Sequence, residues 1–186
     1  MSQQNAQSTA QQARTVAAVD RGKLDLKALT LYAILLAAGF ILNMTVGNAL
    51  AITGIKPQFI IAAYALAIAL TKANVPTAAI FGLVSAAVIQ ITTSIPGLNF
   101  ATELAGAVVM SLLVSSNFGG DKVNPLIAAF VTTLVSGALF AVVGTLIMGF
   151  PLVSAAAKVP VVFGTAIFNA VVVQALYFPL NKVLSK

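Results

Sequence analysis

The stretch ALTLYAILLAAGFILNMTV, from Ala28 to Val46, contains no charged residue. A helix that crosses the hydrocarbon core of a bilayer needs about 20 mostly apolar residues, so this stretch predicts a membrane-spanning helix. Basic residues precede it and are absent within it, which is typical of a span that begins at the cytoplasmic surface. This segment decides the fold class, because the rest of the chain repeats its pattern.

The composition of the whole chain agrees with this reading. Its 186 residues are 60% hydrophobic and 8% charged, with a mean hydropathy of +1.02. Soluble domains carry about 25% charged residues. A chain of this length has room for about six spans with short loops. It leaves no room for a soluble catalytic domain.

Gly, Pro and polar residues divide the chain into six apolar segments. We predict an all-α membrane protein with six transmembrane helices, over residues 28–46, 59–70, 76–95, 103–116, 125–149 and 160–181. The segment GNALAITGIKPQ, residues 47–58, predicts a folded-back or extended loop. Residues 1–27 predict a disordered or interfacial cytoplasmic tail, and residues 28–186 a single membrane domain.

The basic residues indicate the topology. A cytoplasmic amino terminus leaves only Lys56 and Lys158 outside. It places the other basic residues inside, namely Arg14, Arg21, Lys23, Lys27, Lys72, Lys122, Lys182 and Lys186. The net charge of +6 is scattered over the ends of the spans, so it does not indicate a nucleic-acid surface.

Several chemistries lack the residues that they need. The chain contains no Cys and no His, which removes disulfides, thiol nucleophiles and the commonest soft metal ligands. No G-x-x-x-x-G-K-[ST] loop is present, so an ATPase that drives transport would be another polypeptide. We therefore expect a protein that is not an enzyme and that uses no metal and no cofactor.

Glu103, in FATELAG, is the one acid at the start of an apolar run. It either caps its helix, where the dipole favours an acid, or contacts a ligand. Asn43, Gln90 and Asn169 are polar positions within other predicted spans. Polar groups in lipid are costly, so each should face a partner or a wet cavity.

The first predicted span contains an A-x-x-x-A pattern at Ala33 and Ala37, in AILLAAG. The chain also has six short predicted spans, a long first outer loop and outward-facing polar residues. Together these features resemble the substrate-capture (S) components of energy-coupling factor (ECF) transporters. The resemblance implies that Ala33 and Ala37 dock on a transmembrane coupling protein. It also implies an energising module with two ATPases as partner, in a bacterial plasma membrane with both termini cytoplasmic.

Within that group the chain is most similar to the bacterial tryptophan-transporter family. The matching pieces are GIKPQF (residues 54–59), TTSIPGLNF (92–100), LIMGFP (146–151) and a last span with Pro160, Asn169 and Pro179. The family has an Asp near the start of the fourth span, and Glu103 is either its equivalent or an acid shifted by about one turn. The resemblance implies a substrate-binding subunit for tryptophan.

Tryptophan offers an ammonium, a carboxylate and a flat apolar body. We expect Glu103 to bind the ammonium, Lys56 or Lys158 the carboxylate, and aromatic rings the indole. The remaining candidates, for orienting hydrogen bonds and for stacking, are Asn99, Asn169, Gln90, Phe100, Phe140 and Phe163. The alternatives are a proton-coupled secondary carrier that uses Glu103 as its relay, an S component for a vitamin such as pantothenate, and a structural subunit that binds no small molecule.

Overall fold

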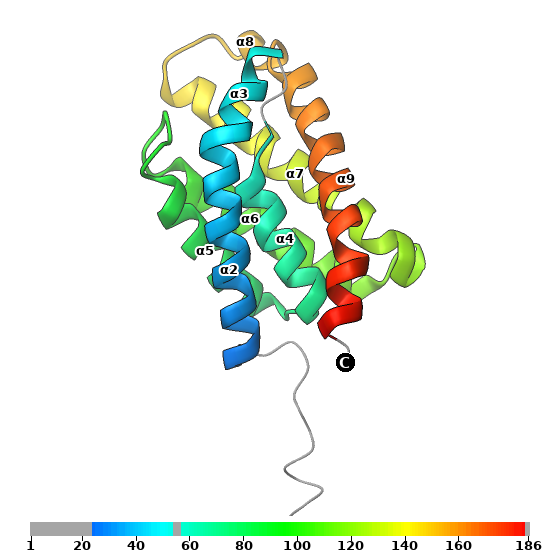
Figure 1. Cartoon of the computed structure of the whole chain (residues 1–186). Coiled ribbons are helices and arrows are strands. Elements are labelled where there is room, and N and C mark those ends of the chain that lie inside the picture. Colours follow the sequence, from blue (N-terminus) through cyan, green and yellow to red (C-terminus); the bar gives the residue numbers. More distant parts are fainter. Residues whose placement is uncertain (1–23, 54–56, 185–186) are drawn as a thin grey trace, which may run out of the picture.

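The structure is a computed structural model that describes residues 24–53 and 57–184. In this part of the chain every regular element is helical (Figure 1). A π-helix, η1 (Asn43–Gly47), follows the first α-helix, and a 3₁₀ turn, η2 (Ala51–Thr53), precedes the first gap. The α-helices are α2 (Leu26–Leu42), α3 (Asn48–Leu50), α4 (Phe59–Thr71), α5 (Val75–Ile89), α6 (Leu98–Ser116), α7 (Gly120–Ile147), α8 (Val153–Ala156) and α9 (Val159–Leu184).

The long helices run alternately up and down the bundle, so their ends gather at two levels. The short helices α3 and α8 lie at one level, here called the α8 end, and α9 finishes at the other, here called the C-terminal end (Figure 1). At the C-terminal end a tight turn joins α4 to α5. Lys72 adopts a left-handed conformation (φ 49°) that ends α4, and Asn74 then caps α5 by accepting a hydrogen bond from the Thr77 amide.

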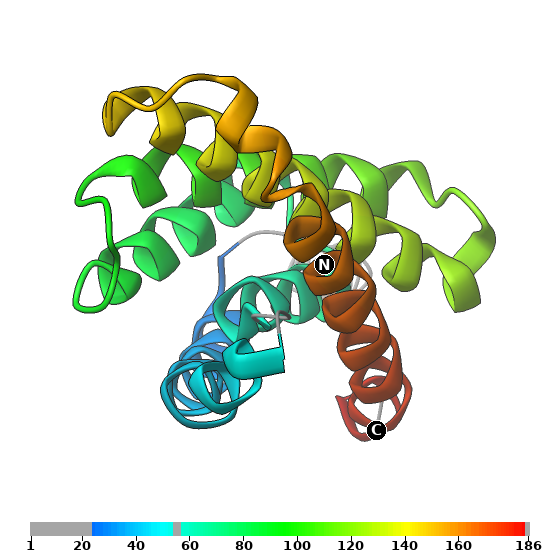
Figure 2. The same cartoon turned by 90° about the horizontal axis from the view of Figure 1, so that it is seen from above.

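Helix α4 forms the centre of the bundle. Every residue from Phe59 to Ala69 is buried, and the helix packs against α2, α5, α6, α7 and α9 (Figure 2). A helix that is apolar on all sides belongs inside a bundle. Its 13 residues rise about 20 Å, less than the hydrocarbon thickness of about 30 Å. Because other helices surround it, α4 does not need to match the bilayer by itself.

Two close helix contacts depend on glycine. A Cβ added at Gly39 in α2 would lie 2.8 Å from the Phe59 carbonyl oxygen in α4. A Cβ at Gly82 in α5 would lie 2.7 Å from the Glu103 carbonyl oxygen in α6. Lipid provides no hydrophobic drive between helices, so such close backbone packing holds a membrane bundle together. The second contact also fixes where Glu103 enters the bundle.

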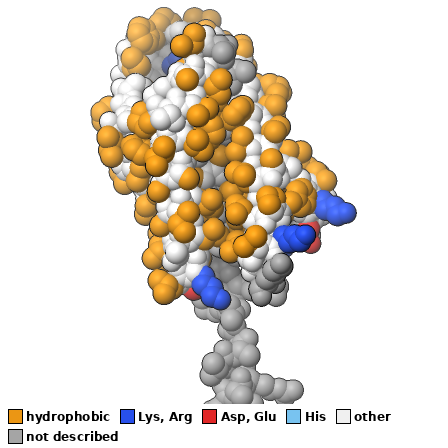
Figure 3. All heavy atoms as spheres, in the orientation of Figure 1, with side chains coloured by type: hydrophobic (Ala, Val, Ile, Leu, Met, Phe, Trp, Pro, Cys, Tyr) orange, Lys and Arg blue, Asp and Glu red, His pale blue; other side chains and the backbone are white. Residues whose placement is uncertain are grey.

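The outer surface matches a bilayer. Four helical segments are long and apolar enough to cross a membrane, Leu26–Leu50, Leu98–Ser116, Gly120–Ile147 and Val153–Leu184, while α4 and α5 are shorter apolar helices. Hydrophobic side chains cover the visible flank, and basic side chains gather toward the C-terminal end (Figure 3). The predicted fold class, an all-α membrane protein, is confirmed, and the protein is multi-pass.

Several predicted boundaries differ from the structure. Helix α7 begins at Gly120, five residues before the predicted start at Pro125. The chain does not become extended after Val46, because the helical path continues through η1, α3 and η2. Helix α5 ends at Ile89, earlier than predicted, with Gln90 at its cap. Helix α6 begins at Leu98, earlier than the predicted start at Glu103, because Gly97 at φ 85° already turns the chain into the helix.

Candidate functional site

A cavity of about 540 Å³ lies at the α8 end of the bundle, within the range of roughly 300–1,000 Å³ that is usual for small-molecule sites. Its polar lining comes from Asn43, Asn48, Gln58, Thr92, Thr93, Ser94, Asn99, Glu103, Thr133, Ser136, Lys158 and Thr165. Its apolar lining comes from Met44, Ile61, Ile89, Gly137, Phe140, Ala141, Ala157, Val161 and Val162. The site thus combines an apolar body with convergent polar groups.

Helical periodicity explains why these side chains converge. Asn99 and Glu103 are four residues apart and therefore share one face of α6. On α7 the stripe runs through Thr133, Ser136, Gly137, Phe140 and Ala141, and near the start of α9 through Lys158, Val161, Val162 and Thr165. Both stripes follow the i, i+3, i+4, i+7 spacing of a single helix face. Three helix faces therefore form most of the wall.

Glu103 is only 5% exposed and lies in the cavity wall. Because α6 begins at Leu98 and has no acid in its first turn, the interpretation of Glu103 as a helix cap is wrong. Ser136 Oγ donates a hydrogen bond to Glu103 Oε2 at 3.4 Å. The Tyr64 hydroxyl adjoins the same carboxylate, in space that Gly106 leaves by having no side chain. That hydroxyl makes no well-aligned hydrogen bond within the described part of the chain.

Asn99 lies one turn before Glu103, at the same wall. Its Oδ1 accepts a hydrogen bond from Thr93 Oγ1 at 2.6 Å, which ties α6 to the loop after α5. Its side chain also contacts the Glu103 carboxylate. The amide oxygen of Asn99 is therefore bonded to the loop, and the side chain lies beside the buried acid.

Lys158 provides the cation of the site from the junction between α8 and α9. Its Nζ donates a hydrogen bond to Thr145 Oγ1 at 3.0 Å. Lys158 and Glu103 both line the cavity but form no ion pair with one another; among the described residues the ion pair is Lys72–Asp121. Among the described residues, the cavity lining therefore has one acidic and one basic group, which do not form an ion pair with each other.

Asn169 lies in the middle of α9, is fully buried and does not line the cavity. Its Nδ2 donates hydrogen bonds to the Gln58 carbonyl oxygen at 3.1 Å and to Thr133 Oγ1 at 3.3 Å. Both partners belong to residues of the lining. Asn169 thus supports the wall from behind.

The other predicted residues are placed as follows. Phe140 lines the cavity, whereas Phe100, Phe163 and Gln90 do not. Phe163 is half-exposed and packs edge-on against Phe130, with ring centroids 5.5 Å apart. Gln90 Oε1 accepts a hydrogen bond from the Gly97 amide at 2.9 Å, at the start of α6. Lys56 lies outside the described residues.

Ala33 and Ala37 lie on the exposed face of α2. The buried face of the same helix carries Ala28, Tyr32, Leu36 and Gly39. The two alanines therefore face away from the bundle, one turn apart.

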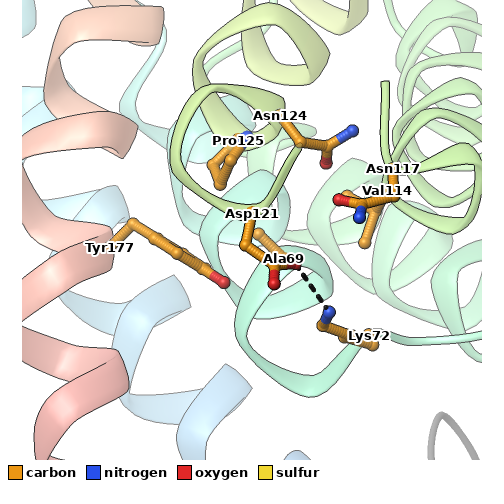
Figure 4. A pocket seen from close by; sticks show the side chains of 8 residues that line it. All are labelled: Ala69, Lys72, Val114, Asn117, Asp121, Asn124, Pro125 and Tyr177. Atoms are coloured by element: carbon orange, nitrogen blue, oxygen red, sulfur yellow. Dashed lines mark hydrogen bonds and ion pairs between the residues drawn. The ribbon is translucent and has the colours of Figure 1, made fainter. Parts of the chain in front are cut away.

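A second pocket, at the C-terminal end, is too small for an organic ligand. Lys72 and Asp121 form an ion pair there at 3.3 Å, with Tyr177 and Asn124 nearby (Figure 4). Its volume of about 10 Å³ corresponds to one water molecule. The binding candidate is therefore the cavity at the α8 end.

Sequence reasoning did not select several lining residues as site candidates. Thr133 and Ser136 are small polar residues in an apolar helix, where they often bond only to their own backbone. Gln58 and Thr93 come from loops, which carry no periodicity. Asn43 has the clearest signal, because it is an amide within a predicted span.

Comparison with known proteins identifies the family. The family model described as "Tryptophan transporter TrpP" matches residues 25–185. A protein of Clostridium acetobutylicum, described as a probable tryptophan transport protein, is 29% identical over 168 residues, which are 86% of this chain and 95% of that protein. No solved structure is significantly similar to the chain. Since the family match extends from the start of α2 to beyond the end of α9, the chain belongs to the tryptophan transporter TrpP family.

Proposed function

We propose that this protein binds tryptophan in the cavity at the α8 end and acts as the substrate-binding subunit of an ECF-type uptake transporter. An energising module of two ATPases and a transmembrane coupling protein would supply the ATP-driven step. The observation that carries the proposal is the pairing of Glu103 and Lys158 in one cavity of about 540 Å³ without a direct ion pair between them.

The lining matches the three parts of a tryptophan molecule. The Glu103 carboxylate accepts hydrogen bonds from the ammonium, and the Lys158 ammonium binds the carboxylate. The indole occupies the apolar part of the lining, where an aromatic ring gains from burial and from edge or stacking contacts.

The distribution of lysines supports an outward-facing cavity. Lys27 and Lys122 lie in the first turns of α2 and α7, Lys72 caps α4, and Lys182 lies in the last turn of α9. All four therefore lie at the C-terminal end, and Lys158 alone among the described lysines lies at the α8 end. Cytoplasmic loops carry the excess of basic residues, so we place both termini in the cytoplasm and the cavity toward the outside.

The exposed face of α2 supports docking to a coupling protein. Ala33 and Ala37 are exposed and one turn apart, and small residues at this spacing let another helix approach closely in the membrane. The opposite side of α2 is already buried against α4, so the side with Ala33 and Ala37 is the one that remains available to a partner.

The first test is direct binding. The chain contains no Trp, so indole fluorescence in a sample of purified protein comes from the ligand alone. Titration of tryptophan should give a saturable change in its emission and anisotropy. Displacement of the bound tryptophan by other candidate cargoes then gives their relative affinities. Saturable binding of pantothenate with no binding of tryptophan would contradict the proposed cargo.

The second test concerns energy coupling. Vesicles that contain this protein together with an ECF module should accumulate tryptophan when supplied with ATP, and vesicles without the module should not. Uptake by this protein alone, driven by a proton gradient and indifferent to ATP, would contradict the ECF proposal and favour a secondary carrier.

A further inference from the structure

Asn43 is a cavity residue that the proposed function leaves unused. It begins the π-helix η1 at the end of α2, is 5% exposed, and lines the cavity. Its Oδ1 is buried and receives no hydrogen bond from the described residues. Single π-turns are rare and occur frequently at functional sites. An unpaired amide at such a turn therefore calls for an explanation.

Asn43 lies on the inner face of its helix, at the start of the π-turn. The buried positions of α2 include Tyr32, Leu36 and Gly39, and the buried positions of η1 are Asn43 and Gly47. Asn43 follows Gly39 by four residues and Leu36 by seven, which is ordinary α-helical spacing, so it continues the inner stripe of α2. The geometry of the backbone presents this amide to the cavity instead of to lipid.

No described group donates a hydrogen bond to the Asn43 amide oxygen. A Cβ added at Gly47 would lie 3.7 Å from Asn43 Oδ1 and 3.2 Å from the Pro57 carbonyl oxygen, so a side chain at this position would crowd the amide. The nearby Asn48 donates its own amide to the Met44 carbonyl oxygen at 3.0 Å. Buried acceptors are paired in nearly all native structures. Unlike the other unpaired buried atoms, on Tyr64, Asn169 and Gln174, this one belongs to a residue that lines the cavity, where a ligand donor can reach it.

We propose that Asn43 determines specificity by accepting a hydrogen bond from the indole N–H of bound tryptophan. This inference rests on the proposed function. Tryptophan has two kinds of donor, the ammonium and the indole N–H, and Glu103 takes the first. The segments that carry Asn43 and Lys158 lie on opposite sides of the bundle when it is viewed from the α8 end (Figure 2). A ligand whose amino-acid end binds Glu103 and Lys158 thus directs its indole toward α2.

The test compares tryptophan with 3-benzothienylalanine, in which sulfur replaces the indole N–H and the shape is nearly kept. Affinities are measured on the purified full chain by ligand fluorescence and by displacement. Wild type should bind tryptophan about tenfold more tightly, since one net hydrogen bond is worth about one decade of affinity. Asn43→Leu, which has similar volume and no acceptor, should reduce that ratio to about one.

Two further variants make the result specific. Asn43→Asp keeps an acceptor oxygen and should retain the preference for tryptophan. Gln174→Met is a matched control, because Gln174 also has a buried unpaired amide oxygen but donates to the Lys122 carbonyl oxygen away from the cavity. It should leave the ratio unchanged.

The outcomes separate the inference from the proposal beneath it. No saturable binding of tryptophan by wild type would overturn both. Saturable binding with equal affinity for the two ligands in wild type, or an unchanged ratio in Asn43→Leu, would overturn the role of Asn43 alone. Equal affinity of wild type for the two ligands would overturn the role of Asn43 even if Asn43→Leu does not fold.

Discussion

Asn169 Nδ2 donates a hydrogen bond to the carbonyl oxygen of Gln58 at 3.1 Å and so joins the middle of α9 to the residue that precedes α4. The same amide reaches Thr133 Oγ1 on α7. One buried side chain therefore fixes the relative positions of three segments, two of which contribute Gln58 and Thr133 to the cavity. The role is one of positioning, because Asn169 itself does not line the cavity.

Asn169→Leu should weaken tryptophan binding and also lower stability. Leaving the Gln58 carbonyl without its donor costs about 1–3 kcal/mol, and the displaced wall should raise the Kd about five- to tenfold. Ser111→Ala is the control, because Ser111 donates a buried hydrogen bond to the Ala73 carbonyl oxygen at 2.7 Å, outside the cavity. It should lower the thermal midpoint with no change in Kd. Equal Kd values in the two variants would contradict a positioning role.

Glu103→Gln should remove the recognition of the ligand ammonium. A charge-assisted hydrogen bond is worth about 1.5–3 kcal/mol, so the Kd for tryptophan should rise about 10- to 100-fold. Indole-3-propionate, which lacks the ammonium, should bind both proteins with similar affinity. If Glu103→Gln weakens both ligands equally, the acid shapes the site without contacting the ammonium.

Lys158→Met should remove the recognition of the ligand carboxylate. Wild type should prefer tryptophan over tryptamine, which has no carboxylate. In the variant the ratio of the two Kd values should fall about tenfold. Lys122→Met, at the C-terminal end, removes a lysine that lies far from the cavity and should keep the preference. A preference that survives in Lys158→Met would assign the carboxylate to another group.

Hydropathy alone predicts the helices of this bundle well. The run that begins at Phe59 starts a helix at that residue, because eleven consecutive residues of α4 are apolar and buried, from Phe59 to Ala69. The start of α6 was predicted wrongly at Glu103, because Pro96 and Gly97 suggest a longer turn. In the structure the turn ends at Gly97, so Glu103 lies in the second turn of α6 and not at its cap.

The site was predictable only in part, for reasons that are physical. A helix that is apolar on every side gives no signal of its rotation, so Phe140 in the cavity and Phe163 on the surface look alike in sequence. The contact between Asn169 and Gln58 joins residues 111 positions apart, and the local sequence around either residue does not predict it. Glu103 and Lys158 could be selected because charges in apolar surroundings are rare.

Gly82→Ala tests the close packing that places Glu103. The added Cβ would lie 2.7 Å from the Glu103 carbonyl oxygen and 2.8 Å from Ala107 Cβ, so α5 and α6 must separate at a cost of about 1–3 kcal/mol. Gly144→Ala is the matched control, because its Cβ would meet Ile95 Cδ1 and Leu98 Cδ2, the ends of flexible side chains. Thermal melting in detergent should show the larger loss for Gly82→Ala. A larger loss for Gly144→Ala would contradict the packing argument.

Ala33→Leu and Ala37→Leu separate binding from coupling. Both side chains are exposed on α2 and contribute nothing to the cavity, so the Kd for tryptophan should stay within about twofold of wild type, consistent with the small effects of exposed substitutions. If a coupling protein packs closely on this face, a leucine at either position prevents the backbones from approaching, and ATP-driven uptake in vesicles with the module should be lost.

Ala175→Leu supplies the control, because Ala175 is an exposed small residue on α9 and its enlargement should leave uptake intact. Uptake at the wild-type rate in both Ala33→Leu and Ala37→Leu would place the coupling surface on a different helix, whereas equal loss in all three variants would mean that any bulk added to the lipid-facing surface impairs transport.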